Sequence, residues 1–370
     1  MTAPTNTWAA TPPEPALGPV GVPPAGAGRR GHPAAGAGAA GPIDEATWRR
    51  VVSAIEAADE VALACHVSPD GDALGSMLAL GLALRAAGRR VVASFGDRRF
   101  AVPRLLRFLP GQDLLVEPAR FPAAPGLMLT FDAATVERLG LLAESARNAR
   151  ELVVVDHHAS NGADTGFGTL RLVDPSAAAT TVLTEELITR LGLPVTEEIA
   201  ACLYTGLVTD TGSFRYATTP AVHAMAGRLV ATGLPADEIS RELWESSPFG
   251  YLKVLAAALG RAVLEPAAAQ AHGLVWTYVS REDRAAFALP YEEVEGVIDV
   301  VRRADEADVA VVLKEDDDGA WQVSARSKGA IDVGRACTAL GGGGHARAAG
   351  FTSHLPPAET VAMLRPLLTP

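Results

Sequence analysis

Histidine and aspartate side chains follow several apolar stretches of this 370-residue chain. In chain order they are His66-x-x-x-Asp70-x-Asp72, Asp132, Asp156-His157-His158 and Asp210. Hard divalent cations prefer carboxylate oxygens, and Mn²⁺ also accepts imidazole nitrogen. A single aspartate at such a place is usually a turn or cap residue. Three ligand-type side chains within seven residues, followed by further acidic sites and no cysteine, instead predict a metal centre that favours Mn²⁺ over Zn²⁺.

Short apolar runs rich in β-branched residues predict the strands that position these side chains. The runs cover residues 61–65, 90–95, 127–131 and 152–155. Helical patterns separate them, which predicts a parallel sheet covered on both faces. In such sheets ligands bind at the carboxyl ends of the strands. The first helix should begin near Ile43 with Asp44 as its N-cap, and helices should dominate from residue 177 to about 260.

A second α/β unit is expected from about Ala271. Its predicted strands cover residues 274–279, 309–313 and 321–325, with a helix near 292–303 that Arg302-Arg303 would end. The fold class is therefore α/β, with a doubly wound, mainly parallel sheet followed by a smaller α/β domain. The expected boundaries are 43–246 for the first domain, 247–269 for a connecting helix and 270–370 for the second domain.

Composition narrows the classes of protein further. In residues 1–42, 28 positions are Pro, Gly or Ala, which predicts a disordered tail. The net charge of −11 argues against binding to long nucleic acid. No apolar stretch reaches the ~18 residues of a membrane span, no signal-peptide pattern is present, and the three cysteines form no CxxC motif. We therefore expect buried thiols, no membrane partner and a cytoplasmic location.

The four histidine and aspartate groups resemble the four motifs of the DHH phosphoesterase superfamily. The glycine-rich segment Gly341–Phe351 and the segment Ser324–Lys328 resemble its DHHA1 substrate-binding domain. The resemblance extends from about Ile43 to the C-terminus. It fits best the NrnA-like subgroup, bifunctional oligoribonucleases and pAp phosphatases, in the form found in actinobacteria. That subgroup implies hydrolysis of very short RNA (nanoRNA, pApA) and of 3′-phosphoadenosine 5′-phosphate (pAp), and some relatives cleave cyclic di-AMP.

The resemblance also implies roles for individual residues. One metal would be bound by His66 and Asp70, the other by Asp72, His157 and Asp210, with Asp132 bridging the two. His158 would lie beside the scissile phosphate, and Asp156 would support the histidine pair. The implied cofactors are two Mn²⁺ ions, with Mg²⁺ or Co²⁺ as substitutes. Two such cations would supply an activated hydroxide, and we expect its attack on phosphorus to proceed without a covalent enzyme intermediate.

The run Gly341–Gly344 leads directly into His345 and Arg347, unlike a flexible linker. Glycines let backbone N–H groups approach phosphate closely, which favours a substrate loop. The predicted substrate-binding residues are Arg326, Lys328, Gly342, Gly343, Gly344, His345 and Arg347. Arg138, six residues after Asp132, could equally contact phosphate or have a salt-bridge or helix-surface role.

Three alternatives remain open. A manganese-dependent inorganic pyrophosphatase of the DHH superfamily shares the first domain, but its second domain differs. A long-strand exonuclease requires a basic channel, which the net charge disfavours. A nucleotide-binding regulator without catalysis is the third. The expected partners are short RNA oligonucleotides and adenosine bisphosphate nucleotides, and a homodimer remains open from the resemblance.

Overall fold

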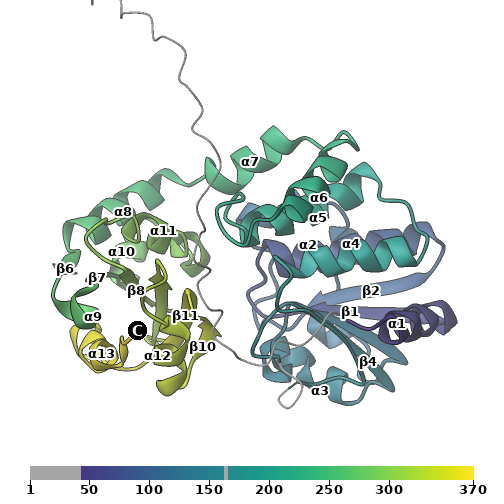
Figure 1. Ribbon diagram of the computed structural model, residues 1–370, viewed down its shortest axis with the longest axis horizontal. Helices are drawn as coiled ribbons and strands as arrows, with labels where there is room; N and C mark the ends of the chain where they lie inside the picture. The colour runs from purple at the N-terminus through teal and green to yellow at the C-terminus, as the bar shows by residue number, and fades with distance from the viewer. Residues whose placement is uncertain (1–42, 162–165) are drawn as a thin grey trace, which may run out of the picture. The chain divides into compact units, whose positions relative to one another are not determined.

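Two β-sheets organise the part of the chain that the computed structural model describes, residues 43–161 and 166–370 (Figure 1). The disorder expected for residues 1–42 lies outside that part. The first sheet contains β1 (Glu60–Cys65), β2 (Arg90–Phe95), β3 (Leu127–Phe131), β4 (Glu151–Asp156) and β5 (Leu170–Val173). The strands are all parallel and stand in the order β2-β1-β3-β4-β5. This confirms the doubly wound parallel sheet and places its topological switch point between β1 and β3.

Alternate residues of these strands supply two different cores. Val61 and Leu63 face a large core that includes Trp48 of the first helix, whereas Ala62 and Ala64 face a smaller core. Asp44 caps that first helix, since its side chain accepts a hydrogen bond from the Thr47 N–H. Both sheet faces are therefore buried, which explains why the strands read as continuous apolar runs.

Most of the helices around the first sheet lie C-terminal to β5. The helices are α1 (Glu45–Ala57), α2 (Gly71–Ala86), α3 (Ala143–Arg147), α4 (Thr180–Arg190), α5 (Glu197–Asp210), α6 (Pro220–Val230) and α7 (Ala236–Trp244). Short 3₁₀ turns are η1 (Arg104–Leu106), η2 (Gln112–Leu114), η3 (Pro118–Arg120) and η4 (Val136–Leu142).

Helices α2 and α5 approach each other unusually closely at glycines. A Cβ atom on Gly75 would lie 2.4 Å from the Cys202 carbonyl oxygen. One on Gly206 would lie 2.9 Å from Cα of Asp72. Since no real side chain fits at these distances, the glycines set the separation of the two helices. Asp72 on α2 and Asp210 at the end of α5 are thereby brought to the same place.

The second sheet is mixed and stands in the order β10-β11-β9-β8-β7-β6. Only β7 and β8 pair in parallel. Its strands are β6 (Val263–Glu265), β7 (Leu274–Val279), β8 (Val309–Glu315), β9 (Trp321–Ser327), β10 (Gly343–His345) and β11 (Ala348–Ser353). The accompanying elements are α8 (Phe249–Gly260), α9 (Ala268–Ala271), α10 (Arg281–Ala285), η5 (Tyr291–Val294), α11 (Val297–Val301), α12 (Val333–Ala339), α13 (Pro357–Leu364) and η6 (Arg365–Leu367).

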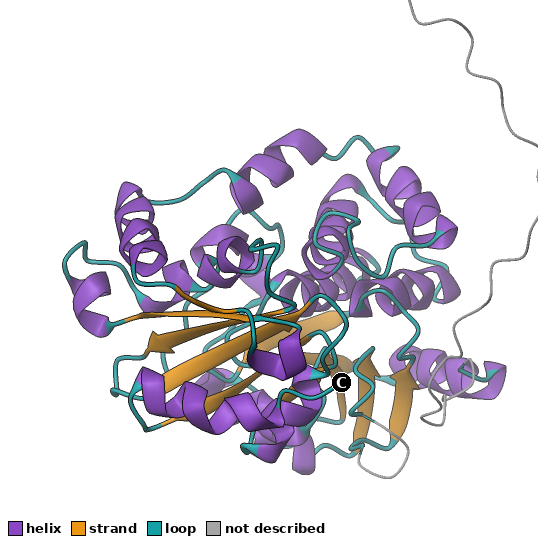
Figure 2. Cartoon of the chain, turned by 60° about the vertical axis from the view of Figure 1, so that its left-hand side comes forward, coloured by secondary structure: helices purple, strands orange, loops and turns teal. Residues whose placement is uncertain are grey.

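The two faces of the second sheet pack against different helices (Figure 2). Val311 and Val323 face a core that includes Cys337 of α12 and Val361 of α13. Val312 faces another, with Val254 of α8 and Val297 of α11. A second α/β unit is thus confirmed.

Two expected helices are shorter in the structure. The connecting helix expected over residues 247–269 ends at Gly260, and β6 then joins the second sheet. The helix expected near 292–303 divides into η5 and α11 around Gly296, a residue with low helix propensity. Arg302 nevertheless caps α11 at its C-terminal end.

The three cysteines, Cys65, Cys202 and Cys337, are free and buried, as expected. Among the described residues, no helix is both long and apolar enough to cross a membrane.

Candidate active site

His66, Asp70 and Asp132 form the first of two clusters at the switch point of the parallel sheet. His66 directly follows β1 and Asp132 directly follows β3, so sheet topology brings them together. Nε2 of His66 lies 3.5 Å from Asp132 Oδ2 and 3.7 Å from Asp70 Oδ2. The opposite nitrogen, Nδ1, donates a 2.8 Å hydrogen bond to the Val67 carbonyl, so Nε2 is the nitrogen that faces the carboxylates.

The second cluster gathers Asp72, Asp132, His157 and Asp210. Nε2 of His157 lies 3.6 Å from Asp132 Oδ1, 3.4 Å from Asp210 Oδ2 and 4.0 Å from Asp72 Oδ2. Its Nδ1 donates to the Ala177 carbonyl at 3.3 Å. As in the first cluster, the free nitrogen of the imidazole faces carboxylates.

Asp132 belongs to both clusters and turns one oxygen toward each. Oδ2 faces His66, and Oδ1 faces His157. Its backbone has a φ of 56°, a left-handed conformation that aspartate tolerates better than most side chains. The Thr180 hydroxyl donates a 2.8 Å hydrogen bond to Oδ1 and fixes the carboxylate. With one oxygen toward each cluster, Asp132 could contact a cation in either one.

The N-terminus of α4 holds Asp72. The Thr180 N–H donates to Asp72 Oδ2 at 2.6 Å, and the Thr181 N–H donates to Oδ1 at 2.9 Å. Helix N-termini favour negative charge because their first N–H groups lack partners within the helix. Thr180 and Thr181 were not predicted as site residues, since an Ala-Ala-Thr-Thr run carries no distinctive sequence signal.

Asp156 orients His158 rather than both histidines. Nδ1 of His158 donates a 2.7 Å hydrogen bond to Asp156 Oδ1, while Asn161 Nδ2 donates to Asp156 Oδ2 at 2.9 Å. His157 is held instead by the Ala177 carbonyl. Asp156 and Asn161 are buried, so this arrangement fixes the ring of His158 at the edge of the two clusters. Asn161 is a further residue that the sequence did not single out.

Burial and neighbouring charges shift the pKa values of the side chains in both clusters. Burial, together with the charge of Asp132, raises the pKa of Asp72 to about 7 and raises that of Asp210 well above its usual value. Burial lowers the pKa of His66, but hydrogen bonds to Asp132 and Asp70 outweigh it and raise that pKa to about 10. Crowded carboxylates whose charges repel are stabilised by a bound cation.

The donor set fits two hard divalent cations. Each cluster combines carboxylate oxygens with one imidazole nitrogen whose opposite N–H is fixed by a carbonyl. Mixed oxygen and imidazole donors without thiolate suit Mn²⁺ and related ions. The acidic cluster thus suits the binding of metal, and the shared Asp132 is placed to join two ions.

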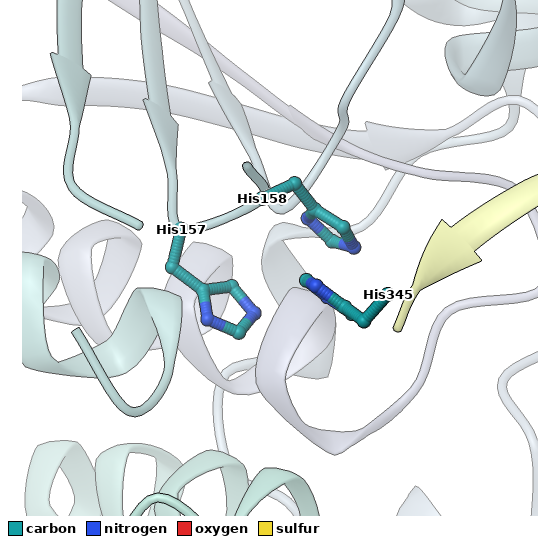
Figure 3. Close-up of side chains that lie close together, drawn as sticks. All are labelled: His157, His158 and His345. Atoms are coloured by element: carbon teal, nitrogen blue, oxygen red, sulfur yellow. The ribbon is translucent and has the colours of Figure 1, made fainter. Parts of the chain in front are cut away.

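The glycine-rich segment places His345 on this site (Figure 3). Its ring stacks on that of His158, with centroids 4.7 Å apart and an interplanar angle of 16°, and lies 5.7 Å from the ring of His157. His345 ends β10, which pairs with β11 through tight glycine contacts. A Cβ atom on Gly342 would meet the Gly350 carbonyl oxygen at 2.0 Å, and one on Gly344 the Ala348 carbonyl oxygen at 2.5 Å.

The remaining predicted substrate residues lie in different surroundings. Gly343 has open space beside its Cα. Arg326 is half-buried, and its Nη1 donates a 3.1 Å hydrogen bond to the Ala325 carbonyl. Lys328 and Arg347 are exposed; the Lys328 amine donates to the Ala304 carbonyl, and the Arg347 guanidinium lies beside Gly329. The structure thus brings His345 to the histidines, whereas Lys328 and Arg347 contact other segments.

Arg138 also lies near the first cluster. Its side chain is exposed, its charge acts on His66, and its carbonyl accepts the Val67 N–H at 2.8 Å. Among the described residues no carboxylate forms an ion pair with it, so the salt-bridge alternative finds no partner there.

Known proteins with the same organisation share both halves of this chain. The DHH family, N-terminal domain, matches residues 60–207, and the DHHA1 domain matches residues 284–363. The bifunctional oligoribonuclease and PAP phosphatase NrnA of Thermus thermophilus is 35% identical over 304 residues, which is 82% of this chain and 86% of that protein. The cyclic-di-AMP phosphodiesterase GdpP of Geobacillus thermodenitrificans is 27% identical over 79% of this chain and 44% of that protein.

A solved structure shows the same fold. An exopolyphosphatase-related protein from Bacteroides fragilis superposes with a TM-score of 0.78 at 23% identity, covering 88% of this chain and 96% of that one. The sequence matches and the histidine and aspartate clusters agree on the class of protein. The chain belongs to the DHH family, with an N-terminal DHH domain and a DHHA1 domain, and is a hydrolase of phosphoric esters.

Proposed function

We propose that this chain hydrolyses pAp and very short oligoribonucleotides such as pApA to mononucleotides, with two Mn²⁺ ions as cofactors. The stacking of His345 on His158 carries the proposal. That contact joins the carboxylate clusters to the glycine-rich hairpin, so a phosphate at the metals would also meet the DHHA1 domain. The relatives named as oligoribonuclease and PAP phosphatase support the same substrates.

Each group of ligands has a defined task in this proposal. His66 and Asp70 would hold one cation, Asp72, His157 and Asp210 the other, and Asp132 both. When bound, the two cations supply water activation and stabilise negative charge on the phosphoryl group. Mg²⁺ or Co²⁺ would substitute with altered rates because they accept similar donor atoms.

His158 would act on the phosphoryl side of the reaction. Burial lowers its pKa, but the hydrogen bond to Asp156 and the charge of Asp132 outweigh burial and raise the pKa overall. A protonated His158 carries a donor at Nε2, since Nδ1 is committed to Asp156. It therefore stabilises a phosphoryl oxygen or protonates the leaving group.

His345 complements that role as a neutral ring. Burial and the positive charges of His158 and His157 lower its pKa to about 4. At neutral pH it adds no charge that would repel its neighbours. Its ring nitrogens can therefore hydrogen-bond to substrate beside His158.

The net charge of the chain supports a short nucleotide substrate rather than a long nucleic acid. With a net charge of −11 the chain has no general attraction for long polyanions. Local cations and a few arginines suffice for one to a few nucleotides. Cyclic di-AMP is a second candidate, favoured by the similarity to GdpP. Inorganic pyrophosphate is disfavoured by the match to the DHHA1 domain, which differs from the second domain of a pyrophosphatase.

A Mn²⁺-dependent turnover panel tests the proposal. The substrates are pAp, pApA, a 5′-labelled short RNA, cyclic di-AMP and pyrophosphate. Asp132→Ala should abolish turnover, because it removes the ligand shared by both clusters. Asp305→Ala, on an exposed loop, is the matched control and should leave turnover unchanged.

The panel distinguishes the alternatives. Phosphate release from pyrophosphate alone would support a pyrophosphatase. Metal binding without turnover of any substrate would support a nucleotide-binding regulator. Hydrolysis in ¹⁸O-labelled water tests the direct attack of water, since single-turnover product without label would require a covalent enzyme intermediate.

A further inference from the structure

A strained loop follows the metal-ligand candidate Asp210. Ser213 and Phe214 have φ values of 59° and 63°, and Ala217 has 48°. The Thr211 carbonyl accepts the N–H groups of both Arg215 and Tyr216 at 2.9 Å, so the loop winds tightly onto the end of α5. Left-handed backbone at several non-glycine residues costs free energy and is concentrated at functional sites. This segment therefore points to a function beyond connecting two helices.

The loop presents Tyr216 to two arginines. The ring lies on the backbone of Gly212, where an added Cβ atom would be 2.7 Å from Tyr216 Cε2. The guanidinium carbon of Arg302 lies 5.0 Å from the ring centroid and that of Arg215 lies 5.6 Å from it. Arg302 comes from the end of α11, so Tyr216 contacts a residue distant in sequence. The ring still keeps 37% of its surface exposed.

These arginines are not neutralised by protein carboxylates. Among residues 43–161 and 166–370, none of Arg215, Arg302 and Arg326 has a carboxylate oxygen within ion-pair distance. Arg215 donates only to the Gly212 carbonyl and Arg326 to that of Ala325. By contrast, Arg261 forms an ion pair with Asp283, and Arg284 forms one with Asp317.

Arg326 lies near the same cluster. Burial lowers its pKa, and Asp299 opposes this effect, while the positive charge of Arg302 lowers the pKa further. Cations that are partly desolvated and close together are stabilised by an anion more than by water.

We propose that Arg302 and Arg215, oriented by Tyr216, bind the second, non-scissile phosphate of a nucleotide substrate together with Arg326. This inference rests on the proposed function and adds residues that the family motifs did not indicate. Cation–π contacts hold the two guanidiniums over the ring without consuming their N–H donors. Among the described residues, the guanidinium N–H groups of Arg302 and the Nη groups of Arg215 have no hydrogen-bond acceptor and remain free for phosphate, which arginine binds through paired hydrogen bonds. Arg302 and Arg215 are thus binding residues, and Tyr216 is a positioning residue.

The test compares substrates that differ only in the second phosphate, pApA against ApA. In the wild type, kcat/KM should be higher for pApA. Arg302→Ala should raise KM for pApA about 10- to 100-fold with little change in kcat, as expected for the loss of charge-assisted hydrogen bonds. KM for ApA should not change. Arg303→Ala is the matched control, because Arg303 is the exposed neighbour whose Nε donates to the Asp299 carbonyl.

Variants of Tyr216 separate binding from positioning. Tyr216→Phe keeps the ring and should behave as the wild type, whereas Tyr216→Leu should reproduce part of the Arg302→Ala effect. An equal loss of kcat/KM for pApA and ApA in Arg302→Ala would overturn the proposal. The contact of Tyr216 with the arginines would then only join two segments of the chain. Thermal unfolding of each variant verifies that it is folded.

A binding measurement keeps this inference separate from the proposed function. Calorimetric titration of the metal-free protein with pAp and with 3′-AMP, which lacks the non-scissile 5′-phosphate, requires no turnover. Tighter binding of pAp that is lost in Arg302→Ala supports the phosphate site, even if no substrate is hydrolysed and the proposed function fails. Binding of pAp that is insensitive to Arg302→Ala overturns the inference, even if the wild type hydrolyses pAp.

Discussion

Nδ1 of His158 donates a 2.7 Å hydrogen bond to Oδ1 of Asp156, and this contact fixes which nitrogen of His158 faces the site. The same aspartate accepts a hydrogen bond from Asn161 on its other oxygen. Asp156 is fully buried, so its charge acts on His158 through a medium of low polarity. The chemistry of one histidine therefore depends on a neighbour two residues earlier in the chain.

Asp156→Asn should lower kcat roughly 10- to 100-fold. The Asn161 amide would then meet another amide, the ring of His158 would lose its fixed orientation, and its raised pKa would fall. Since the protonated ring is the active form, the alkaline limb of the kcat–pH profile should move to lower pH. Mn²⁺ affinity should change little, because Asp156 holds neither His66 nor His157. An unaltered pH profile would contradict the role given to His158.

Metal affinity should rise with pH between about pH 6 and 8. The pKa of His66, raised to about 10, means that His66 holds a proton throughout this range, and the pKa of Asp72, raised to about 7, means that Asp72 holds one over the lower part of it. A cation binds only their deprotonated forms, so each bound ion displaces protons. Titration calorimetry in buffers of different ionisation enthalpy measures that release. Zero proton release at pH 7 would show that these ligands are already deprotonated or do not bind the metal.

Removal of metal should lower the melting temperature of the protein. A ligand that binds only the folded state stabilises it by about 2.7 kcal/mol at a hundred times its Kd. Chelation should therefore produce a clear decrease in Tm, and added Mn²⁺ should reverse it. Asp132→Ala should be largely insensitive to both treatments. If the wild type and Asp132→Ala respond alike, the clusters around Asp132 are not where the cation binds.

Glycine substitutions test the packing of α2 on α5. Gly75→Ala should destabilise the protein by about 1–3 kcal/mol, since the new methyl group would overlap the Cys202 carbonyl. Gly206→Ala should also weaken Mn²⁺ binding roughly tenfold, because it pushes against Asp72. Gly227→Ala on α6 is the control: it meets no atom within 4 Å and should be neutral or stabilising by about 0.5–1 kcal/mol. Denaturant unfolding measures all three, and equal effects would exclude the packing explanation.

Arg104 connects three segments near the start of α8. It pairs with both carboxylate oxygens of Glu293 and donates hydrogen bonds to the backbone and side chain of Ser246. Glu293 keeps only 7% of its side chain exposed. Arg104→Ala should lower the free energy of unfolding by about 1.5–3 kcal/mol, the usual loss when hydrogen bonds to a charged group are removed.

A charge exchange provides the control for that prediction. Arg104→Glu should be more damaging than Arg104→Ala, and the double variant Arg104→Glu/Glu293→Arg should recover part of the lost stability. Arg85→Ala, which breaks an exposed ion pair with Asp113, should lower the free energy of unfolding by less than about 1 kcal/mol. If the double variant is no more stable than Arg104→Glu alone, the ion pair is not the source of the stabilisation.

Much of the site could be predicted from local sequence. Apolar runs placed β1 and β3, and the side chains directly after them, His66 and Asp132, met because parallel strands expose their carboxyl ends on one edge. The motif from Asp156 to His158 was equally visible. These features depend on residue type and position along one strand, which a sequence displays directly.

Only the tertiary structure shows which residues hold the side chains of the site in place. Thr180 and Thr181 fix Asp72 from a helix more than a hundred residues away, and Asn161 orients Asp156 from a loop without a motif. The short strands β6 and β10 were missed because three residues give no periodic signal. The meeting of Tyr216 with Arg302 depends on the docking of two distant segments. The pattern of residue types along the chain determines the local helices and strands and the ligand side chains that they carry. Contacts between distant residues depend on tertiary packing, which no local pattern shows.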